Sequence, residues 1–326
     1  MERVEKTLKE RLIIMDRIYI RELEEGSKIS TTFLVKQKQL LPFKNKKGKF
    51  LHVILGDRTG EIEGRLWETA EDIFPRLNDK NIVHVEGEVS RYKDIFQINI
   101  ISIAPSENYV IEDLLPVSNR NINEMENELD EVISSIENKN LKELLDRIFT
   151  DEELYRNFTR SPAAKFHHQA YIGGLLEHTL GVVKVADSLA GVYPDIDRCL
   201  LITGALVHDI GKIEELVYEE QIEYSDGGRL IGHIVLGVNL IQRNIDRIPA
   251  FPEDLKIKLI HMIVSHHGEY EWQSPKRPKF IEAMLLHYAD MIDVQVDKFN
   301  QVKNSTGENE AWSGWVKGLD RYIYLK

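Results

Sequence analysis

Several features that define other classes of protein are absent from this sequence of 326 residues. Its single cysteine, Cys199, excludes disulfides within the chain and any metal site built from several thiolates. No segment reaches the ~18 to 20 apolar residues of a membrane helix, and the N-terminus has no apolar signal stretch. We therefore expect a cytoplasmic protein that does not enter a membrane.

An excess of positive charge is also lacking. The chain has 42 Lys and Arg residues against 54 Asp and Glu residues, a formal net charge of -12. Such a surface cannot coat nucleic acid as a whole, because that binding depends on neutralising phosphates. The balance is uneven, however: residues 27–105 hold 13 cationic and 10 anionic side chains, whereas residues 106–160 hold 6 and 14. Any site for a polyanion must therefore be local.

The first part of the chain has the pattern of a β-domain. From about Lys28 to Ala104, short apolar alternations are broken by turn residues, which predicts consecutive strands. A handful of strands in so short a segment fits a small closed barrel of the OB type. The chain is too long for one ordinary core. We therefore expect a multi-domain protein whose N-terminal all-β, OB-type barrel occupies residues 1–105.

The rest of the chain has a helical pattern. Residues 106–160 are expected to form an acidic helical connector, with Asn121 or Asn123 as an N-cap. Beyond it, apolar residues recur every three or four positions near 172–190, 198–212, 231–246, 253–266 and 280–299. Residues 161–326 are therefore expected to form a second, all-α domain.

The most informative motif is His208-Asp209, followed by Ile210-Gly211-Lys212, at the end of an apolar helical segment. At helical spacing His208 shares a face with Leu201 and Ala205, which points it inward, and Asp209 lies beside it. A carboxylate in such surroundings is costly unless a cation compensates its charge. A lone inward histidine is more often a hydrogen-bonded core residue than a metal ligand, so the interpretation depends on further candidate ligands.

Such candidates fall on or beside the apolar faces of other predicted helices. Together with the His-Asp pair they form a set of five imidazoles and two carboxylates: His178, His208, Asp209, His233, His266, His267 and Asp290. The set is large enough for two divalent ions, and its mixed nitrogen and oxygen ligands suit Mn²⁺, Fe²⁺, Co²⁺, Ni²⁺ or Zn²⁺ better than Mg²⁺ or Ca²⁺. Two such ions can share one carboxylate and activate a water beside a phosphoryl group. The pattern predicts phosphoester hydrolysis.

The order of these residues resembles the HD phosphohydrolase superfamily, in which a His precedes a His-Asp pair and a late Asp follows. The resemblance covers about residues 165–295. It implies a two-metal site built from the seven residues above, with Asp209 as the bridge between the metals. It also implies that Lys212 lies near the scissile phosphate, so Asp209 and Lys212 are the expected catalytic residues. Asp293 could orient a ligand, although a solvated or salt-bridged residue is the plainer expectation.

One branch of these enzymes cleaves cyclic dinucleotides and carries a Gly-Tyr-Pro signature that is missing between Gly268 and Pro275. The chain is instead similar to the YhaM-type 3′-to-5′ exoribonucleases at three motifs: Ser161-Pro162-Ala163-Ala164, His167-His168 and Tyr171 to Thr179. With the barrel included, this similarity covers nearly the whole chain. It implies Mn²⁺-stimulated removal of nucleotides from the 3′ end of single-stranded RNA, with single-stranded DNA as an open second substrate. His168 is a further candidate catalytic residue, with a purely structural role equally open.

The barrel offers candidate residues for holding such a strand. OB barrels stack bases on aromatic side chains while cationic side chains follow the backbone. The expected nucleic-acid-binding set is Phe43, Lys44, Lys46, Lys47, Lys49, Trp67 and Tyr92, with Phe33 and Phe96 as further candidate platforms. An aromatic residue in a small barrel can instead belong to the core, and a lysine run can be a solvated loop.

Two other functions remain open on the sequence alone. The chain could be an HD enzyme that acts on nucleotides or cyclic dinucleotides, with the barrel used for regulation. It could also be a non-catalytic single-strand-binding protein whose helical domain only assembles subunits. The sequence leaves open the native metal and the oligomeric state, a homo-oligomer included.

Overall fold

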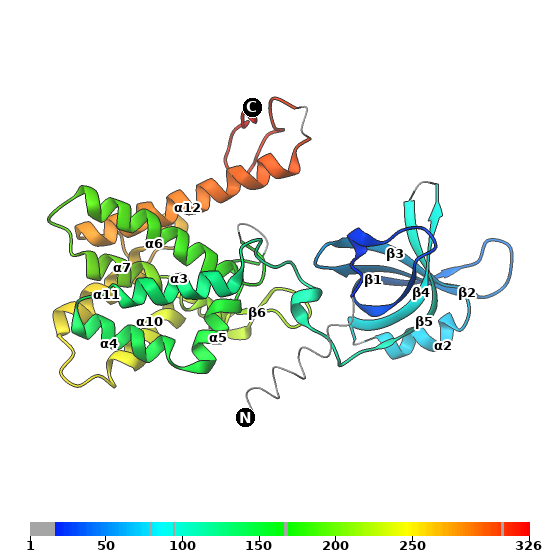
Figure 1. Ribbon diagram of the computed structural model, residues 1–326, viewed down its shortest axis with the longest axis horizontal. Coiled ribbons are helices and arrows are strands. Elements are labelled where there is room, and N and C mark those ends of the chain that lie inside the picture. Colours follow the sequence, from blue (N-terminus) through cyan, green and yellow to red (C-terminus); the bar gives the residue numbers. More distant parts are fainter. Residues whose placement is uncertain (1–16, 79, 94, 166–168, 308–309) are drawn as a thin grey trace. The chain divides into compact units, whose positions relative to one another are not determined.

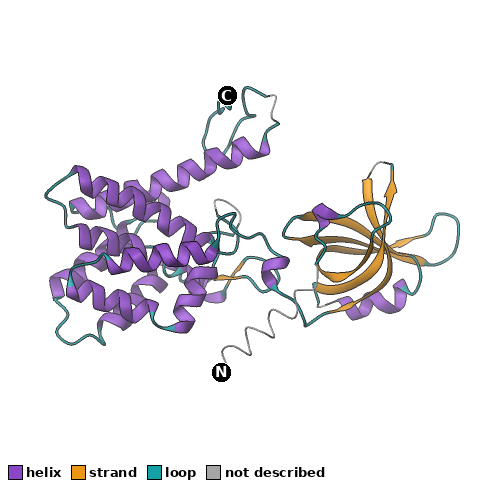
Figure 2. Cartoon of the chain, viewed as in Figure 1, coloured by secondary structure: helices purple, strands orange, loops and turns teal. Residues whose placement is uncertain are grey.

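The computed structural model of the protein describes residues 17–78, 80–93, 95–165, 169–307 and 310–326. The chain divides into two compact units, Met1–Pro116 and Val117–Lys326. Strands make up most of the first unit and helices most of the second (Figures 1 and 2). No helix in the described part of the chain is both long enough and apolar enough to span a membrane.

The first unit is a closed five-stranded barrel in the order β1-β2-β3-β5-β4. Its strands are β1 (Lys28–Pro42), β2 (Lys49–Asp57), β3 (Gly60–Leu66), β4 (Ile82–Tyr92) and β5 (Ile95–Pro105). β3 and β5 pair in parallel, whereas the other neighbouring strands pair antiparallel. Among its described residues the unit also has four short helices: η1 (Ile20–Glu22), α2 (Ala70–Ile73), η2 (Phe74–Leu77) and η3 (Ile111–Asp113).

The alternation along β2 explains why this segment folds as a strand of a barrel. Leu51, Val53 and Leu55 are fully buried, whereas the intervening Phe50 and His52 are half-buried, so the apolar set points to one side. The inward set joins Phe33 and Val85 in the barrel core. The prediction of an OB-type barrel followed by a helical domain is confirmed.

The second unit begins with three helices, α3 (Ile122–Ser134), α4 (Lys139–Phe149) and α5 (Glu152–Arg160). Each starts at a residue whose side chain accepts hydrogen bonds from backbone N–H groups of the first turn, namely Asn121, Asn138 and Asp151. Of the two N-cap candidates in the sequence, Asn121 and Asn123, the N-cap of α3 is therefore Asn121. The apolar faces of these helices lie in the same core as the later helices. The boundaries at residues 105 and 160 remain predictions.

The remaining helices carry the candidate site. They are α6 (Gly174–Val192), α7 (Arg198–Val207), α8 (Lys212–Glu215), α9 (Asp226–Leu230), α10 (His233–Ile245), α11 (Glu253–Ser265), η4 (Tyr270–Trp272) and α12 (Ile281–Ser305). A small hairpin of β6 (Leu216–Val217) and β7 (Glu223–Tyr224), which the sequence pattern did not indicate, separates α8 from α9. The sequence pattern predicted one helix over residues 198–212. In the structure α7 ends at Val207, and a turn separates it from α8.

Candidate metal centre

The structure brings all seven predicted ligands together inside the second unit. His178 lies on α6, His208 and Asp209 follow α7, His233 begins α10, His266 and His267 follow α11, and Asp290 lies on α12. Five of them are buried, whereas His233 and His267 are partly exposed. Residues that are remote along the chain therefore meet at one place.

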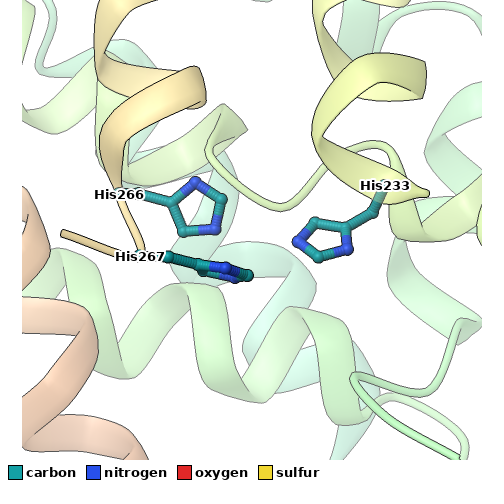
Figure 3. A group of neighbouring side chains, drawn as sticks. All are labelled: His233, His266 and His267. Carbon is teal, nitrogen blue, oxygen red and sulfur yellow. The ribbon is translucent and has the colours of Figure 1, made fainter. Parts of the chain in front are cut away.

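Six of the candidate ligands form two groups of three. In the first, His178, His208 and Asp290 hold their ligand atoms within 4.8 Å of one another. The Nε2 atom of His178 lies 3.2 Å from that of His208 and 3.3 Å from Oδ1 of Asp290. In the second group, the imidazoles of His233, His266 and His267 converge from α10 and the end of α11 (Figure 3). Each group could hold one metal ion.

Asp209 lies between the two groups. Its Oδ2 atom is 3.5 Å from Nε2 of His178 and 3.4 Å from Nε2 of His208. Its Oδ1 atom is 3.5 Å from Nε2 of His233 and 3.5 Å from Nε2 of His266. One carboxylate thus offers a separate oxygen to each group, which is the geometry of a bridging ligand.

The orientation of each imidazole is set by a hydrogen bond at its other nitrogen. All five Nδ1 atoms face an oxygen acceptor: Asp293 Oδ2 at 2.8 Å from His178, Ala205 O at 2.9 Å from His208, Glu215 Oε1 at 3.1 Å from His233, Ile263 O at 2.7 Å from His266 and Trp272 O at 2.8 Å from His267. Because these acceptors require Nδ1–H to donate, a neutral ring presents the Nε2 lone pair to the centre. Metal-ligating histidines are commonly held in this way.

Unsatisfied atoms at the centre test whether a cation fits. Among the residues that the structure describes, Oδ1 of Asp209 and Nε2 of His233 and His266 are buried without a hydrogen-bond partner. Leaving such atoms unpaired costs about 1 to 3 kcal/mol each, so native proteins rarely do so. Since all three are lone-pair donors facing one space, a divalent cation would satisfy them together.

The charges at the centre agree with this fit. Burial opposes a negative charge on Asp209, yet Lys212 and His208 outweigh it and hold the pKa of this carboxyl well below its usual range. Burial and then the neighbouring His266 and His233 lower the pKa of His267 to about 3, which keeps its ring neutral. Burial also disfavours a charged His178, but hydrogen bonds to Asp209, Asp290 and Asp293 raise its pKa well above the usual value. The three carboxylates therefore favour a positive charge at this place, and a bound metal ion would supply it.

Two glycines, Gly211 and Gly181, leave room for His233 and Asp293 to lie close to the neighbouring backbone. A Cβ atom on Gly211, in the turn after the His-Asp pair, would lie 2.0 Å from the carbonyl oxygen of His233. A Cβ atom on Gly181 of α6 would lie 2.0 Å from Oδ1 of Asp293. Any larger residue at either position would push a ligand or its hydrogen-bond partner away from the centre.

Lys212 lies beside the Asp209 carboxylate, with its Nζ atom 2.6 Å from Oδ2. Burial lowers the pKa of this amine, but Asp209 raises it further, so the ammonium stays charged. Lys212, His233 and His267 also line a pocket of about 570 Å³ that opens next to the centre. The remaining catalytic candidate, His168, lies outside the described residues.

Two further carboxylates, Asp293 and Glu215, orient candidate ligands. Asp293 accepts hydrogen bonds from Nδ1 of His178 and from the Gln169 amide, and so orients a ligand. Its spacing of one helical turn from Asp290 was the available signal. Glu215 accepts from both the backbone N–H and Nδ1 of His233. Nothing in the sequence pattern singled out Glu215, because its partner lies 18 positions away.

The barrel carries an aromatic cluster, defined here as Phe43, Phe50 and Trp67. The ring centroids of Phe50 and Trp67 are 4.8 Å apart, and those of Phe43 and Trp67 are 6.2 Å apart. Lys46 lies over the Phe43 ring at 4.1 Å, and Lys44, Lys47 and Lys49 are exposed nearby in sequence. Phe50 was not among the predicted residues, although the strand alternation placed it outside the barrel.

The other predicted platforms have different surroundings. Tyr92 is 54% exposed, and the Arg65 guanidinium lies 5.9 Å from the centroids of both the Tyr92 and Trp67 rings. Phe96 is partly buried beneath Arg91, whose guanidinium is 4.8 Å from the ring. The prediction for Phe33 is wrong: this ring faces the barrel interior and is fully buried, so it cannot stack on a base.

Comparison with known families defines the class of the protein. The HD domain family matches residues 175–295, and the family described as an OB-fold nucleic acid binding domain matches residues 34–105. The chain is therefore an HD-domain protein with an OB-fold module, and an HD domain implies binding of a divalent metal.

Curated relatives define the family within this class. Proteins named 3′-5′ exoribonuclease YhaM are similar over almost their whole length. The one from Shouchella clausii is 32% identical over 94% of this chain and 96% of its own. Those from Bacillus licheniformis and Listeria monocytogenes are 31% and 30% identical, over 93% and 92% of this chain and 96% and 95% of their own. This chain belongs to the YhaM 3′-5′ exoribonuclease family, as its motifs predicted.

Proposed function

We propose that this protein is a metal-dependent 3′-to-5′ exoribonuclease that hydrolyses single-stranded RNA at a dinuclear centre. Family membership supports the activity. The observation that carries the dinuclear part is the position of Asp209, whose two oxygens face two separate groups of candidate ligands. In each cycle water adds to the terminal phosphodiester phosphorus and the bond to the preceding O3′ breaks. The strand regains a 3′-hydroxyl and a nucleoside 5′-monophosphate leaves.

The proposed ligands follow from the two groups. His178, His208 and Asp290 would hold one ion, His233, His266 and His267 the other, and Asp209 both. A pair of divalent cations supplies Lewis acidity toward the phosphate and lowers the pKa of a shared water. The nitrogen-rich ligand set favours Mn²⁺, with Fe²⁺, Co²⁺, Ni²⁺ or Zn²⁺ as alternatives, over Mg²⁺.

Lys212 is proposed to act on the substrate phosphate. Its ammonium lies at the border between Asp209 and the open pocket, so one of its protons can reach a non-bridging phosphate oxygen. A positive charge at this point stabilises the negative charge that develops during attack. Asp209 and Lys212 are therefore the proposed catalytic residues among those described.

The barrel is proposed to retain the strand between cycles. Phe43, Trp67 and Tyr92 expose ring surface, and Lys44, Lys46, Lys47 and Lys49 supply positive charge. Stacking on aromatic rings tolerates any base and does not require a 2′-hydroxyl, so single-stranded DNA is proposed as a second substrate. Binding of this kind also suits an enzyme that advances along a strand.

The direct test uses a 5′-labelled single-stranded RNA with either a free or a phosphorylated 3′ end, incubated with Mn²⁺ or with EDTA. The proposal predicts a ladder that shortens from the 3′ end, release of nucleoside 5′-monophosphates, and survival of the blocked strand. Internal cleavage, release from the 5′ end, or equal activity in EDTA would overturn it. A cyclic dinucleotide in parallel distinguishes the alternative HD activity, because it has no 3′ end to attack.

A further inference from the structure

The pocket beside the second histidine group is also lined by apolar residues that the metal chemistry does not use. We infer that this pocket binds the 3′-terminal nucleoside of the strand, with the base against an apolar rim formed by Tyr224, Leu230 and Ile231. The inference rests on the proposed exoribonuclease function and specifies where its substrate ends.

The residues that line the pocket are of two chemical kinds. Lys212, Glu215, His233 and His267 line the side toward the metal centre. The apolar rim, which comes from β7 and the end of α9, lines the same pocket. A phosphate held beside Lys212 and the histidines would therefore leave its nucleoside within the same pocket as the apolar rim.

The backbone places the rim directly beside a ligand. Gly232 separates Ile231 from His233 and has a φ of +80°, a conformation that disfavours any residue with a Cβ atom. After this turn α10 begins at His233, and the side chains of Leu230 and Ile231 just before the turn line the pocket. The rim and the metal ligand are consequently parts of one short, conformationally defined segment.

The rim is accessible to a ligand. Leu230 is 85% exposed, Ile231 50% and Tyr224 40%, although all three are apolar or aromatic and contribute to the same pocket. Single exposed apolar residues are common, but a group beside a polar centre is typical of a binding site. The flat face of a nucleobase is a suitable partner, and contact with it does not depend on which base is present.

Cationic side chains next to the rim fit the rest of the strand. Arg229 lines the pocket and lies 3.2 Å from Glu223, which also pairs with Lys165. Lys165 lies 5.9 Å from the centroid of the Tyr224 ring. The volume of about 570 Å³ is that of a small-molecule site, so it accommodates one nucleotide rather than a folded strand.

The test measures binding by the full-length protein in Mn²⁺ with two ligands, adenosine 5′-monophosphate and ribose 5-phosphate, by calorimetry. These ligands share the phosphate and sugar and differ in the base. We expect the unmodified protein to prefer the nucleotide by about tenfold or more, the range for one base contact. The double variant Leu230→Ser, Ile231→Ser should lose most of this preference and keep its affinity for ribose 5-phosphate. In RNA degradation the same variant should raise KM more than it lowers kcat.

Ile257→Ser is the matched control, because Ile257 is 59% exposed on α11 and does not line the pocket. It should retain the preference. The inference is overturned if the unmodified protein binds both ligands equally, or if the double variant keeps the full preference. Failure of the proposed function has a different signature, since the unmodified protein would then leave RNA intact whichever ligand it binds.

Discussion

The metal centre and the aromatic cluster of the barrel differ most in burial. At the centre, polar groups are removed from water, and each imidazole is held by a hydrogen bond at its Nδ1 atom. On the barrel, Trp67 and Tyr92 are exposed and the neighbouring lysines are solvated. A buried polar group needs a hydrogen-bond partner or a bound ion, because the free-energy cost of its desolvation is otherwise uncompensated. An exposed ring has no such requirement.

This difference determines what each region can establish about function. The centre specifies a chemistry, since few ligands other than cations satisfy converging imidazoles and carboxylates. The barrel surface, in contrast, is proposed to contribute RNA affinity through several separate contacts. Substitutions at the centre should therefore abolish turnover, whereas substitutions on the barrel should weaken binding in small steps.

The largest expected effect is that of Asp209→Asn. Removing the charge of the Asp209 carboxylate should raise the activation free energy by about 4 kcal/mol or more and so lower kcat about 10³-fold or more, while RNA binding through the barrel persists. Single-turnover kinetics and binding to a 3′-blocked RNA separate the two effects. If this variant cleaves RNA at the normal rate, the centre does not perform the chemistry.

A smaller loss is expected for Glu215→Gln. The amide keeps the shape of the side chain but weakens the acceptor for Nδ1 of His233, so metal affinity or activity should fall by about 10- to 100-fold. Excess Mn²⁺ should restore part of the activity. Glu214→Gln is the control, because Glu214 pairs with Arg243 away from the centre and its change should have little effect.

On the barrel, Trp67→Ala should raise KM for single-stranded RNA by about 5- to 100-fold through the loss of one stacked base, with kcat nearly unchanged. Tyr109→Ala is a matched control, since Tyr109 has a similar exposure in the same unit and lies outside the aromatic cluster. Equal effects of the two variants would remove the argument for a specific binding surface.

The smallest expected effect is that of Lys46→Ala. Loss of one phosphate contact should weaken RNA binding at low salt and reduce the slope of log affinity against log salt by about 0.7. Titrations at several salt concentrations measure the slope. An unchanged slope would mean that Lys46 only covers the Phe43 ring, over which it lies.

The sequence was sufficient to predict the seven candidate ligands and the two architectures, because helical periodicity points His208 inward and strand alternation defines the barrel. It could not reveal that the Nδ1 acceptors include the backbone carbonyls of Ala205, Ile263 and Trp272, since every residue has such a group. Glu215 was missed because only the packing of α8 against α10 brings it to His233. Phe33 was wrongly predicted to stack on a base because an aromatic residue in a strand can face either the barrel interior or the solvent. Only the register of the barrel shows that Phe33 faces the interior.

The central claim is that Asp209 joins two metal sites, and anomalous diffraction from crystals grown with Mn²⁺ tests it most directly. The account predicts two peaks, one among His178, His208 and Asp290 and the other among His233, His266 and His267, with an oxygen of Asp209 at each. A single peak, or peaks at which Asp209 is not a ligand, would contradict it.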